Sequence, residues 1–576
     1  MSAVRTISAE LTHLVAQGAA ALGHAGVLDT IEPAVPTNNA SFGDYQSNHA
    51  FRLAKALKQN PRALAEALRQ ALPAHPAVVK VDVAGPGFLN FFLSDSWLAE
   101  HVAAQVQDPH LGVPQRGAGQ TVVIDYSAPN VAKRMHVGHL RSTNIGNALD
   151  QLHWAVGYQV IADNHIGDWG TQFGKLMVTW RKHLDRAHLA EDPIGELERL
   201  YVLFADIATP ELEAEARAET AKLQRGDPEN RALWQQFIAI SMGEFNAVYD
   251  RLGVRFDETL GESAYNDMLA GIVQTLLDQG VAEASDGAVV IKYTEADGKG
   301  LADTVLVVRK ADGAFLYGTT DIATLRYRLD RWKPARIVYV TDTRQQLHFR
   351  QLFAATARLG WTQAEVVHTW FGMLKLPEGS MGTRKGNVIR LIDLLDESVR
   401  RARAVVDAKS PELDEGERAV IAEAVGVGAI RYADLSQNPQ TDVTFEWDRM
   451  LSLEGNTAPF LMYSYARCRN VQRKGGVDAP EVRDIQISHP LERELLLALS
   501  RTPEAVQSAL ETSRPNLLCD HLFGMAQAFN RFYFELPVLN AESAELRVSR
   551  LSLIEATARV LGHGLRLLGL RPLDRM

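Results

Sequence analysis

The sequence predicts a multidomain protein in which a Rossmann-like α/β domain with a helical insertion lies between an N-terminal α+β domain and an all-α C-terminal bundle. The length of 576 residues exceeds what one core supports, so several domains are expected. The apolar run at 122–124 and the helical periodicity at 140–156 are typical of the strand, loop and helix that open a doubly wound fold. From residue 391 onward the chain is almost wholly of helical character, with amphipathic runs such as 551–568.

The domain boundaries are expected where the composition changes. The predicted domains are residues 1–110, residues 111–390 with a helical insertion at about 182–285, a helical connecting region at 391–455, and the bundle at 456–576. The stretch 107–120 contains two prolines and three glycines and is interpreted as the first linker. The insertion is polar and rich in helical patterns, and it interrupts the series of strands.

Periodicity and turn residues predict the individual elements. Helices are expected at 7–22 and 49–72, the second interrupted at Asn60-Pro61, and strands at 79–83, 88–93, 122–124, 159–162, 336–341 and 366–370. The strands 305–308 and 314–317 flank Asp312-Gly313, a pair that favours a hairpin turn.

Composition narrows the class of protein. A net charge of −10 argues against an unselective nucleic-acid coat, which needs broad phosphate neutralisation, but it leaves room for selective RNA binding through local basic patches. The two cysteines, Cys468 and Cys519, lie far apart and support neither a disulfide framework nor a thiolate zinc site. No apolar stretch is long enough for a membrane span, so we expect a cytoplasmic protein without membrane or DNA partners.

The most informative segment runs from Asp125 to Thr143 and reads DYSAPNVAKRMHVGHLRST. It lies where a strand ends and a helix begins, a place where backbone amides and the helix dipole favour phosphate. His136 and His139 are suited to donate hydrogen bonds to phosphate oxygens, Gly138 permits close approach of a nucleotide, and Lys133 adds positive charge. By itself a His-x-x-His pair fits surface residues or metal ligands equally well.

As a whole, this segment resembles the HIGH signature of class I aminoacyl-tRNA synthetases, in the form found in arginyl enzymes, with Val137 in place of isoleucine. A second segment, NHIGDWGTQFG at 164–174, follows the strand at 159–162 with a similar spacing to that in arginyl enzymes. The resemblance implies a class I catalytic domain and an ATP site that includes His136, Gly138, His139 and Met381.

A third segment, GSMGTRKGNVI at 379–389, resembles a degenerate KMSKS loop. Ser380 and Thr383 stand at the two lysine positions. The resemblance implies that Lys133 substitutes for the second lysine, and that Arg384 and Lys385 are the candidates for contact with pyrophosphate. An exposed Arg-Lys pair alone is usually a solvated turn.

The planar guanidinium of arginine requires carboxylates in bidentate geometry. The stretch FLYGTTDIA at 315–323 resembles the arginine-contacting strand and helix of the family, which places Tyr317 and Asp321 near the guanidinium. Asp321 at the start of a helix is also suited to be an N-cap. The same resemblance assigns to arginine binding four further residues: Asp125, Ser127, Asn130 and Gln345.

Both ends of the chain resemble RNA-binding parts of arginyl enzymes. FLMYSYARCRN at 460–470 and FNRFY at 529–533 resemble the helical anticodon-binding domain and interleave aromatic and basic residues, a combination that reads unstacked bases. An aromatic stripe buried in a core is the alternative for any single residue. GDYQSN at 43–48 is similar to the extra N-terminal domain that contacts the tRNA elbow.

The resemblance implies ATP-dependent ligation of L-arginine to tRNA(Arg) through an arginyl-adenylate, with AMP and pyrophosphate as the other products. It implies Mg²⁺ bound with ATP, no metal held by the protein, and a monomer. Two alternatives stay open on the residues alone. One is another adenylyl-transferring enzyme, and the other is a synthetase-like RNA-binding protein without catalysis.

Overall fold

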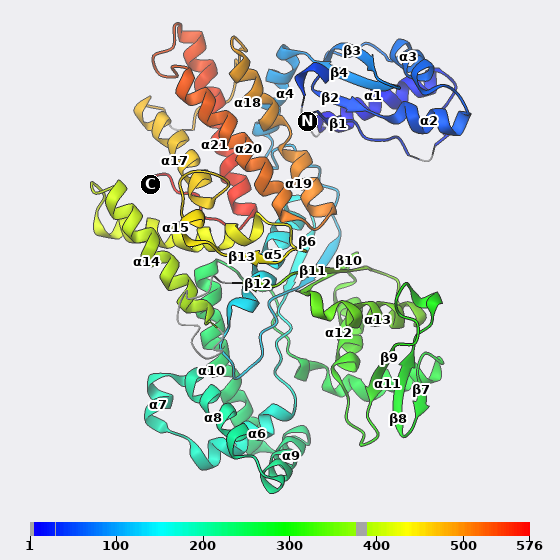
Figure 1. Cartoon of the computed structure of the whole chain (residues 1–576), viewed down its shortest axis with the longest axis vertical. Helices are drawn as coiled ribbons and strands as arrows, with labels where there is room; N and C mark the ends of the chain where they lie inside the picture. The colour runs from blue at the N-terminus through cyan, green and yellow to red at the C-terminus, as the bar shows by residue number, and fades with distance from the viewer. Residues whose placement is uncertain (1–4, 29, 38, 376–388, 478) are drawn as a thin grey trace. The chain divides into compact units, whose positions relative to one another are not determined.

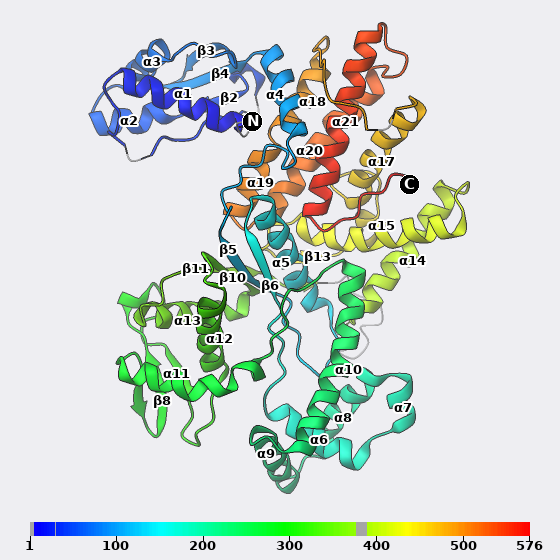
Figure 2. The ribbon, with the colours of Figure 1, turned by 180° about the vertical axis from the view of Figure 1, so that it is seen from behind.

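The computed structural model describes residues 5–28, 30–37, 39–375, 389–477 and 479–576. These residues form two compact units, whose elements are labelled in Figure 1 and seen from behind in Figure 2. Unit 1 comprises residues 1–116, 453–567 and 571–576, and unit 2 comprises residues 117–452 and 568–570. Unit 1 thus combines segments from both ends of the chain. The predicted division into four domains remains a prediction.

The N-terminal part of unit 1 is an antiparallel sheet of order β1-β2-β4-β3 with helices packed on it, as an α+β domain requires. Its strands are β1 (Val35–Pro36), β2 (Tyr45–Ser47), β3 (Val78–Ala84) and β4 (Phe88–Leu93). Its helices are α1 (Ile7–Ala21), α2 (His49–Leu57), α3 (Pro61–Ala71) and α4 (Asp95–Gln107). Asn60 caps α3 by accepting the N–H of Ala63, and Pro61 occupies the first turn. The predicted interruption therefore separates two helices.

The second part of unit 1 is a helical bundle, as predicted. Its helices are α17 (Ala458–Lys474), α18 (Pro490–Ser500), α19 (Thr502–Glu511), α20 (Pro515–Glu535) and α21 (Ala544–Leu567). The first four of these begin with a proline in the first turn, where the missing N–H costs no hydrogen bond. Both cysteines are buried in this bundle, and no disulfide joins them.

Unit 2 is centred on a parallel sheet of order β11-β10-β5-β6. Its strands are β5 (Thr121–Asp125), β6 (Gln159–Asp163), β10 (Arg336–Asp342) and β11 (Glu365–Phe371), and α5 (Val137–Ala155) follows β5. All four predicted strands are present. Asp125 at the end of β5 lies opposite Asp163 of β6 and Tyr339 of β10. The carboxyl ends of the strands thus share one edge, where ligands bind in open α/β sheets.

A lobe of helices follows β6. It contains α6 (Thr171–His183), α7 (Arg186–Glu191), α8 (Pro193–Ile207), α9 (Pro210–Gln224) and α10 (Pro228–Leu252). The side chains of Asp192, Thr209 and Asp227 cap α8, α9 and α10, each just before a proline. Helices therefore fill much of the predicted insertion, and a further helix, α11 (Asn266–Asp278), also lies within its predicted bounds of about 182–285, which remain a prediction.

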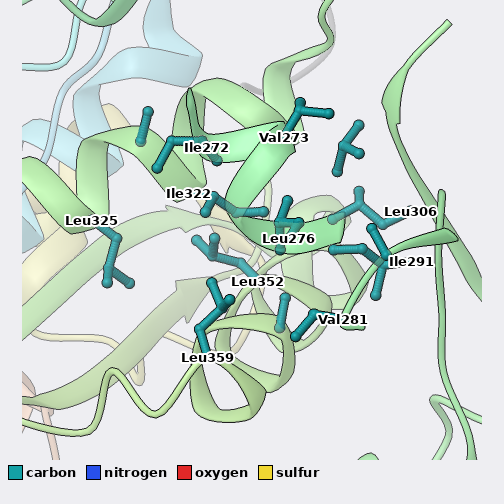
Figure 3. Close-up of a cluster of buried hydrophobic side chains, with 14 of the residues drawn as sticks. Ile272, Val273, Leu276, Val281, Ile291, Leu306, Ile322, Leu325, Leu352 and Leu359 are labelled. Atoms are coloured by element: carbon teal, nitrogen blue, oxygen red, sulfur yellow. The ribbon is translucent and has the colours of Figure 1, made fainter. Parts of the chain in front are cut away.

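Residues 262–332 and 343–358 form a second lobe with a mixed structure, whereas β10 between them belongs to the central sheet. Its elements are the short 3₁₀ helices η2 (Glu262–Tyr265), η3 (Glu295–Asp297) and η4 (Thr343–Gln345), the strands β7 (Glu283–Ser285), β8 (Ala288–Lys292) and β9 (Val305–Arg309), and the helices α11 (Asn266–Asp278), α12 (Tyr317–Trp332) and α13 (Gln346–Arg358). Figure 3 shows the core of this lobe, where Leu276 of α11, Ile291 of β8, Leu306 of β9, Ile322 of α12 and Leu352 of α13 pack together.

The hairpin predicted around Asp312-Gly313 is wrong in its second strand. The turn exists, since the Lys310 N–H donates to Ala314 O and Arg309 forms a single bridge with Phe315. Tyr317, however, begins α12, and β9 pairs with β8 instead. The apolar face of α12 packs in the lobe core, and this tertiary packing outweighs the local preference for a strand after the turn.

The remaining elements of unit 2 are β12 (Leu374–Lys375), α14 (Leu391–Lys409), α15 (Glu415–Leu435), β13 (Val443–Thr444) and α16 (Trp447–Met450). β12 and β13 pair in parallel, so the region after residue 391 is helical except for this short strand. Unit 1 also contains the 3₁₀ helix η1 (Ala40–Phe42). Among the helices of the described ranges, none has the length and apolarity that crossing a membrane requires.

Candidate active site

His136 and His139 form the start of α5. His136 is the N-cap residue, and its Nδ1 accepts the N–H of Gly138 at 3.0 Å. The Nδ1 of His139 accepts the N–H of His136 at 3.1 Å, which completes a reciprocal capping box. Gly138 is required because a Cβ at this position would lie 2.7 Å from Cε1 of His136. The start of the helix therefore fixes both imidazoles, whose centroids are 4.0 Å apart.

The protonation of the two imidazoles follows from their surroundings. Burial lowers the pKa of His139 to about 3, and the neighbouring His136 contributes to this shift. Burial also lowers the pKa of His136, and the positive charges of Lys133 and Arg344 lower it further. Both rings are neutral at physiological pH. Because each Nδ1 accepts a hydrogen bond, the ring proton lies on Nε2 and remains available to a ligand.

The loop between β5 and α5 has an unusual backbone. Ser127, Ala128 and Ala132 have positive φ angles of 73°, 49° and 64°, which non-glycine residues rarely adopt. Ser127 is held by two hydroxyls: Oγ lies 2.8 Å from the Tyr249 hydroxyl and accepts a 2.9 Å hydrogen bond from Thr143 Oγ1. The predicted ligand Ser127 is thus buried and already bonded inside the protein.

The second motif lies against the first. Asn130 and Gly167 form a parallel bridge, and the Val131 N–H donates to Gly167 O at 3.0 Å. A Cβ at Gly167 would lie 2.1 Å from Oδ1 of Asn130, so this close approach requires glycine. The side chain of Asn130 is exposed at this junction. The two segments that the sequence singled out therefore line one site.

Three carboxylates gather beside this junction, and one of them, Glu262 in η2, was not predicted. Asp168 of the second motif accepts hydrogen bonds from the N–H and Oγ of Ser263, at 2.8 and 2.6 Å. Burial, together with the charges of Asp321 and Asp168, raises the pKa of Glu262 to about 7, although the charge of His165 opposes the shift. A cation bound here would relieve the repulsion. An isolated glutamate in a polar stretch has no local signal that marks it.

The first turns of α12 contain Tyr317 and Asp321. The N-cap of α12 is Leu316, so Asp321 lies inside the helix and the alternative role as an N-cap is wrong. Its Oδ2 lies 2.5 Å from Nε2 of His348 on α13. The ring of His348 also makes an edge contact with Tyr317, which is 60% exposed. An aromatic ring and a carboxylate therefore stand side by side at an accessible surface. His348 is a further residue of this group that was not predicted.

Asp125 has a different partner from the one expected. The buried Arg328 of α12 donates through Nη2 to Oδ2 of Asp125 at 2.7 Å, and its Nε donates to Oδ2 of Asp163 at 2.9 Å. Arg328 is fully buried and lies over the ring of Tyr339. The carboxylate of Asp125, which the sequence assigned to the substrate, is therefore already paired with a guanidinium of the protein itself. The substrate role of Asp125 stays a prediction that this contact does not favour.

The remaining predicted residues lie at the edges of the site. Lys133 is exposed, with Nζ 4.9 Å from the ring centre of Tyr201, and Gln345 is exposed in η4. Met381, Arg384 and Lys385 lie outside the described residues. The chain that follows them pairs with the histidine segment, because the Val137 N–H donates to Ile389 O and the Leu391 N–H donates to Met135 O.

Unit 1 contains the aromatic and basic residues expected to meet RNA. The guanidinium of Arg467 on α17 lies over the rings of Tyr463, Tyr533 and Phe534, at 4.7 to 5.1 Å. Phe534 is 70% exposed and Tyr463 40%, so this cluster is an accessible stacking surface. By contrast, Phe529 of the second predicted motif is buried in the core.

A cavity of about 620 Å³ opens beside the same helix. Its wall includes Tyr465, Arg469, Gln472 and Arg473 of α17, with Asp574 opposite them. The volume is that of a small-ligand site, and the lining offers both a ring edge and guanidinium donors.

The GDYQSN motif is mostly buried. Asp44 accepts two hydrogen bonds from Arg493 of α18, at 2.8 and 2.9 Å, and the Tyr45 hydroxyl donates to Glu504 of α19 at 3.0 Å. Gly43 lies so close to the backbone of Phe91 that a Cβ would be 2.5 Å from its carbonyl oxygen. Within unit 1, the motif therefore joins the N-terminal sheet to the helical bundle.

Comparisons with known proteins agree with this arrangement. Residues 101–447 match the family model described as tRNA synthetases class I (R), catalytic domain, residues 461–576 match the DALR anticodon binding domain, and residues 7–93 match the arginyl tRNA synthetase N terminal domain. The arginine–tRNA ligase of Fusobacterium nucleatum is 46% identical over 95% of this chain and 96% of its own, and that of Azotobacter vinelandii is 44% identical over 98% and 99%. The arginyl-tRNA synthetase structure of Thermus thermophilus superposes with a TM-score of 0.85 at 26% identity, covering 99% of this chain and 100% of that one.

Proposed function

We infer the roles of individual residues from the premise that this chain belongs to the arginyl-tRNA synthetase family and joins arginine to tRNA at the expense of ATP. The two other interpretations that the residues left open do not account for family matches along nearly the whole chain. The overall reaction follows from the family. The side chains that carry out each step, the use of Mg²⁺, the oligomeric state and the location are proposed below.

In the first step, the carboxylate of arginine attacks the α-phosphate of ATP and pyrophosphate leaves. We assign the stabilisation of the charged transition state to the Nε2–H groups of His136 and His139, at the positive end of α5. Lys133 and the segment with Arg384 and Lys385 would neutralise the leaving pyrophosphate. Neutral imidazoles suit this role, since they donate hydrogen bonds without a change in protonation.

Gly138 and Met381 complete the proposed ATP site, and Mg²⁺ would enter bound to the triphosphate. The fit of Gly138 is supported by its exposure and by the imidazole ring that already fills the space of a side chain. No nucleophile from the protein is needed, because the substrate's own carboxylate attacks. Positioning and charge stabilisation therefore account for the catalysis.

The guanidinium of arginine is proposed to lie between Asp321 and Glu262, against the ring of Tyr317. The mutual repulsion of the carboxylates near Glu262 supports this, because a buried cation would offset it. His348 holds Asp321 in place. Asn130 and Gln345, both exposed at the site, are proposed to bind the amino and carboxylate groups.

For Asp125 and Ser127 we propose indirect roles. Asp125 anchors α12 through Arg328, and Ser127 holds the loop that positions Asn130. Both residues then act on arginine through their neighbours rather than by direct contact.

In the second step, the 2′-hydroxyl of the terminal adenosine of tRNA attacks the carbonyl carbon of the arginyl-adenylate, and AMP leaves as the ester forms and the hydroxyl loses its proton. The cavity beside α17 is proposed to receive an anticodon base, and the Arg467 cluster another, because stacking and charge together suit unstacked bases. We also propose a monomer, since the contacts of both ends of the chain complete unit 1 within one copy. A cytoplasmic location is expected from the role of charged tRNA in translation.

One observation supports the residue assignments above all others. Unit 2 contains both the capping box of His136 and His139 and, separate from it, the acidic group of Glu262, Asp321 and Asp168. Pyrophosphate exchange, measured with each amino acid and with or without arginine tRNA, tests the assignments. Exchange is expected with arginine alone among the amino acids and only when tRNA is present. Exchange with another amino acid would contradict the assigned acidic pocket.

The variant Asp321→Asn sharpens this test. It keeps the shape of the side chain and removes its charge, so we expect the KM for arginine to rise at least tenfold while the KM for ATP changes less than twofold, in accord with the loss of a charge-assisted hydrogen bond of roughly 1.5–3 kcal/mol. The exposed ion-pair partner Asp330 of the same helix provides the control Asp330→Asn. Equal losses for arginine and ATP would show that Asp321 serves only the fold.

A further inference from the structure

A second, smaller cavity of unit 1 has no role in the steps described above. It has a volume of about 320 Å³ and lies where the chain leaving α4 meets α17 and α21. Its polar lining includes Asp108 from the segment after α4, Tyr465 and Arg469 from α17, and Arg559, His563 and Arg566 from α21. The Arg559 Nη1 donates to Val106 O at 3.1 Å, which fixes α21 to that segment.

The cavity has more hydrogen-bond donors than the protein satisfies. Arg469 and Arg559 share one buried carboxylate, Glu555, at 3.0 and 2.7 Å. Arg566 is exposed at the cavity, and no hydrogen bond or ion pair joins it to another residue of the described ranges. The carboxylate of Asp108 already accepts the N–H groups of His110 and Gly112. A third carboxylate, Asp574, lies 3.9 Å from Nε of Arg469. Arg469 and Arg559 therefore have carboxylate partners, whereas Arg566 has none among the described residues.

His563 adds an unsatisfied group. Its Nε2 is buried and has no hydrogen-bond partner among the described residues. Burial lowers the pKa of His563 to about 4, and the positive charge of Arg566 contributes. The ring is therefore neutral, and a buried ring nitrogen without a hydrogen-bond partner carries a desolvation cost. A ligand that accepts hydrogen bonds from both arginine and histidine would remove this cost.

The neighbouring cavity identifies the ligand. Tyr465 and Arg469 line both the 320 Å³ cavity and the 620 Å³ cavity proposed for an anticodon base. A polynucleotide presents a phosphate next to each base, and phosphates are bound by guanidinium groups in a forked geometry. One nucleotide of a single strand can thus place its base on one side of Tyr465 and its phosphate on the other.

We propose that the cavity formed by Arg469, Arg559, His563 and Arg566 binds a backbone phosphate of the anticodon arm of tRNA. The inference rests on the proposed anticodon role of α17. It makes the segment after α4, which connects the N-terminal domain to unit 2 in sequence, part of the wall of an RNA site.

The test uses the full-length enzyme and Arg566→Gln, because Arg566 is exposed and its loss leaves no buried group unpaired. The Kd for tRNA is measured as a function of salt, together with the KM for arginine. Loss of one charge-assisted hydrogen bond is expected to raise the Kd for tRNA about tenfold. The slope of log K against log salt should fall by about 0.7, the value for one phosphate of a single strand. The KM for arginine should stay constant.

Two further variants separate the possible failures. Arg217→Gln removes an exposed arginine of α9 that lines neither cavity, and it should leave the Kd for tRNA unchanged. Arg473→Gln, in the larger cavity alone, tests the anticodon role itself. A loss with Arg473→Gln but none with Arg566→Gln would overturn the phosphate site and leave the anticodon proposal standing. No loss with either would overturn both.

Phosphate ethylation interference identifies the group that is bound. One ethylated phosphate in the anticodon arm should weaken binding to the parent enzyme about tenfold and have no further effect on Arg566→Gln, because the two changes remove the same contact. Equal effects of every ethylated phosphate on both enzymes would overturn the proposal. Inorganic phosphate provides a second probe, and its binding is followed by the NMR signals of His563. If inorganic phosphate binds there and tRNA binding is unchanged, the proposal is overturned in favour of a site for free anions.

Discussion

At the scale of single residues, Glu262 controls how arginine binding should respond to pH. Its carboxyl has a pKa raised to about 7, first by burial and then by Asp321 and Asp168. Below this pH the free enzyme holds the neutral acid, which attracts the guanidinium less than the carboxylate does. The Kd for arginine should therefore fall as the pH rises from 6 to 8, with most of the change near pH 7, since the cationic groups of arginine do not titrate there.

Tryptophan fluorescence or calorimetric titration with arginine, without ATP, measures this dependence. Glu262→Gln should bind more weakly and lose most of the change between pH 6 and 8. Glu283→Gln, which alters an exposed carboxylate of β7, is the matched control and should retain the full pH response. A pH response that survives in Glu262→Gln would contradict its assignment to this carboxyl.

The residue scale also shows where sequence reasoning stops. The histidine segment was recognisable because its function depends on a contiguous string, in which the cap, the glycine and the second histidine lie within four residues. Glu262, His348 and Arg328 belong to the same site but come from η2, α13 and the middle of α12. Each is an ordinary residue in its own segment. Only the tertiary fold brings them to the two motifs.

At the scale of elements, α12 is fixed to the sheet by the Arg328 pair. Breaking a buried ion pair from one side leaves uncompensated charge. The variant Arg328→Met should therefore lower the free energy of unfolding of unit 2 by about 3–5 kcal/mol. It should also raise the KM for arginine, because Tyr317 and Asp321 lie on the same helix. Hydrogen exchange of the β5 and β6 amides measures the first effect.

Arg326→Met provides the comparison, since Arg326 forms an exposed pair with Asp330 that should contribute less than about 1 kcal/mol. Similar losses of unfolding free energy in the two variants would mean that the buried pair stabilises unit 2 no more than the exposed pair does. The triple change Asp125→Asn, Asp163→Asn and Arg328→Met should recover part of the stability, because it removes all three charges together.

Element boundaries were predictable where local chemistry decides them. Asn60-Pro61 and the apolar strand before Asp125 behaved as expected, because a cap with a following proline and a buried parallel strand are defined by a few neighbouring residues. The strands β7 and β8 were missed since they are short and lie at the end of a polar stretch. The buried side chains of β8 pack in the lobe core with residues of α12 and α13, which lie farther along the chain.

At the scale of the whole molecule, the buried contacts of Arg493 hold unit 1 together. Arg493 donates to Asp44 and, at 2.6 Å, to Asp95, so it joins α18 to the N-terminal sheet and to α4. Removing it should leave the buried carboxylate of Asp44 without its cationic partner, with only the N–H of Leu93 donating to it. We expect Arg493→Met to accelerate exchange of the Ser8 amide, which donates to Glu504 across the same junction, by tenfold or more, a change of roughly 1.4 kcal/mol in the local opening free energy.

The control is Arg531→Met, whose partner Glu494 lies on the same helix as Arg493 but on an exposed surface. It should leave Ser8 exchange unchanged. If the Ser8 amide exchanges equally slowly in both variants, then apolar packing rather than the Arg493 contacts keeps the two parts of unit 1 in place.

The composition of unit 1 also sets an order for synthesis on the ribosome. Asp44 and Tyr45 emerge early, but Arg493 and Glu504, which they need, are translated more than 400 residues later. Unit 2 is also completed late, because its last three residues are 568–570. Gly569 among them packs so closely on Arg431 that a Cβ would lie 2.0 Å from Nη2 of that arginine. Domains usually fold as they emerge, N-terminal first. In this chain neither unit is complete until residues after α21 have been synthesised. A nascent chain halted before α18 would therefore expose the Asp44 face to the quality-control machinery of the cell.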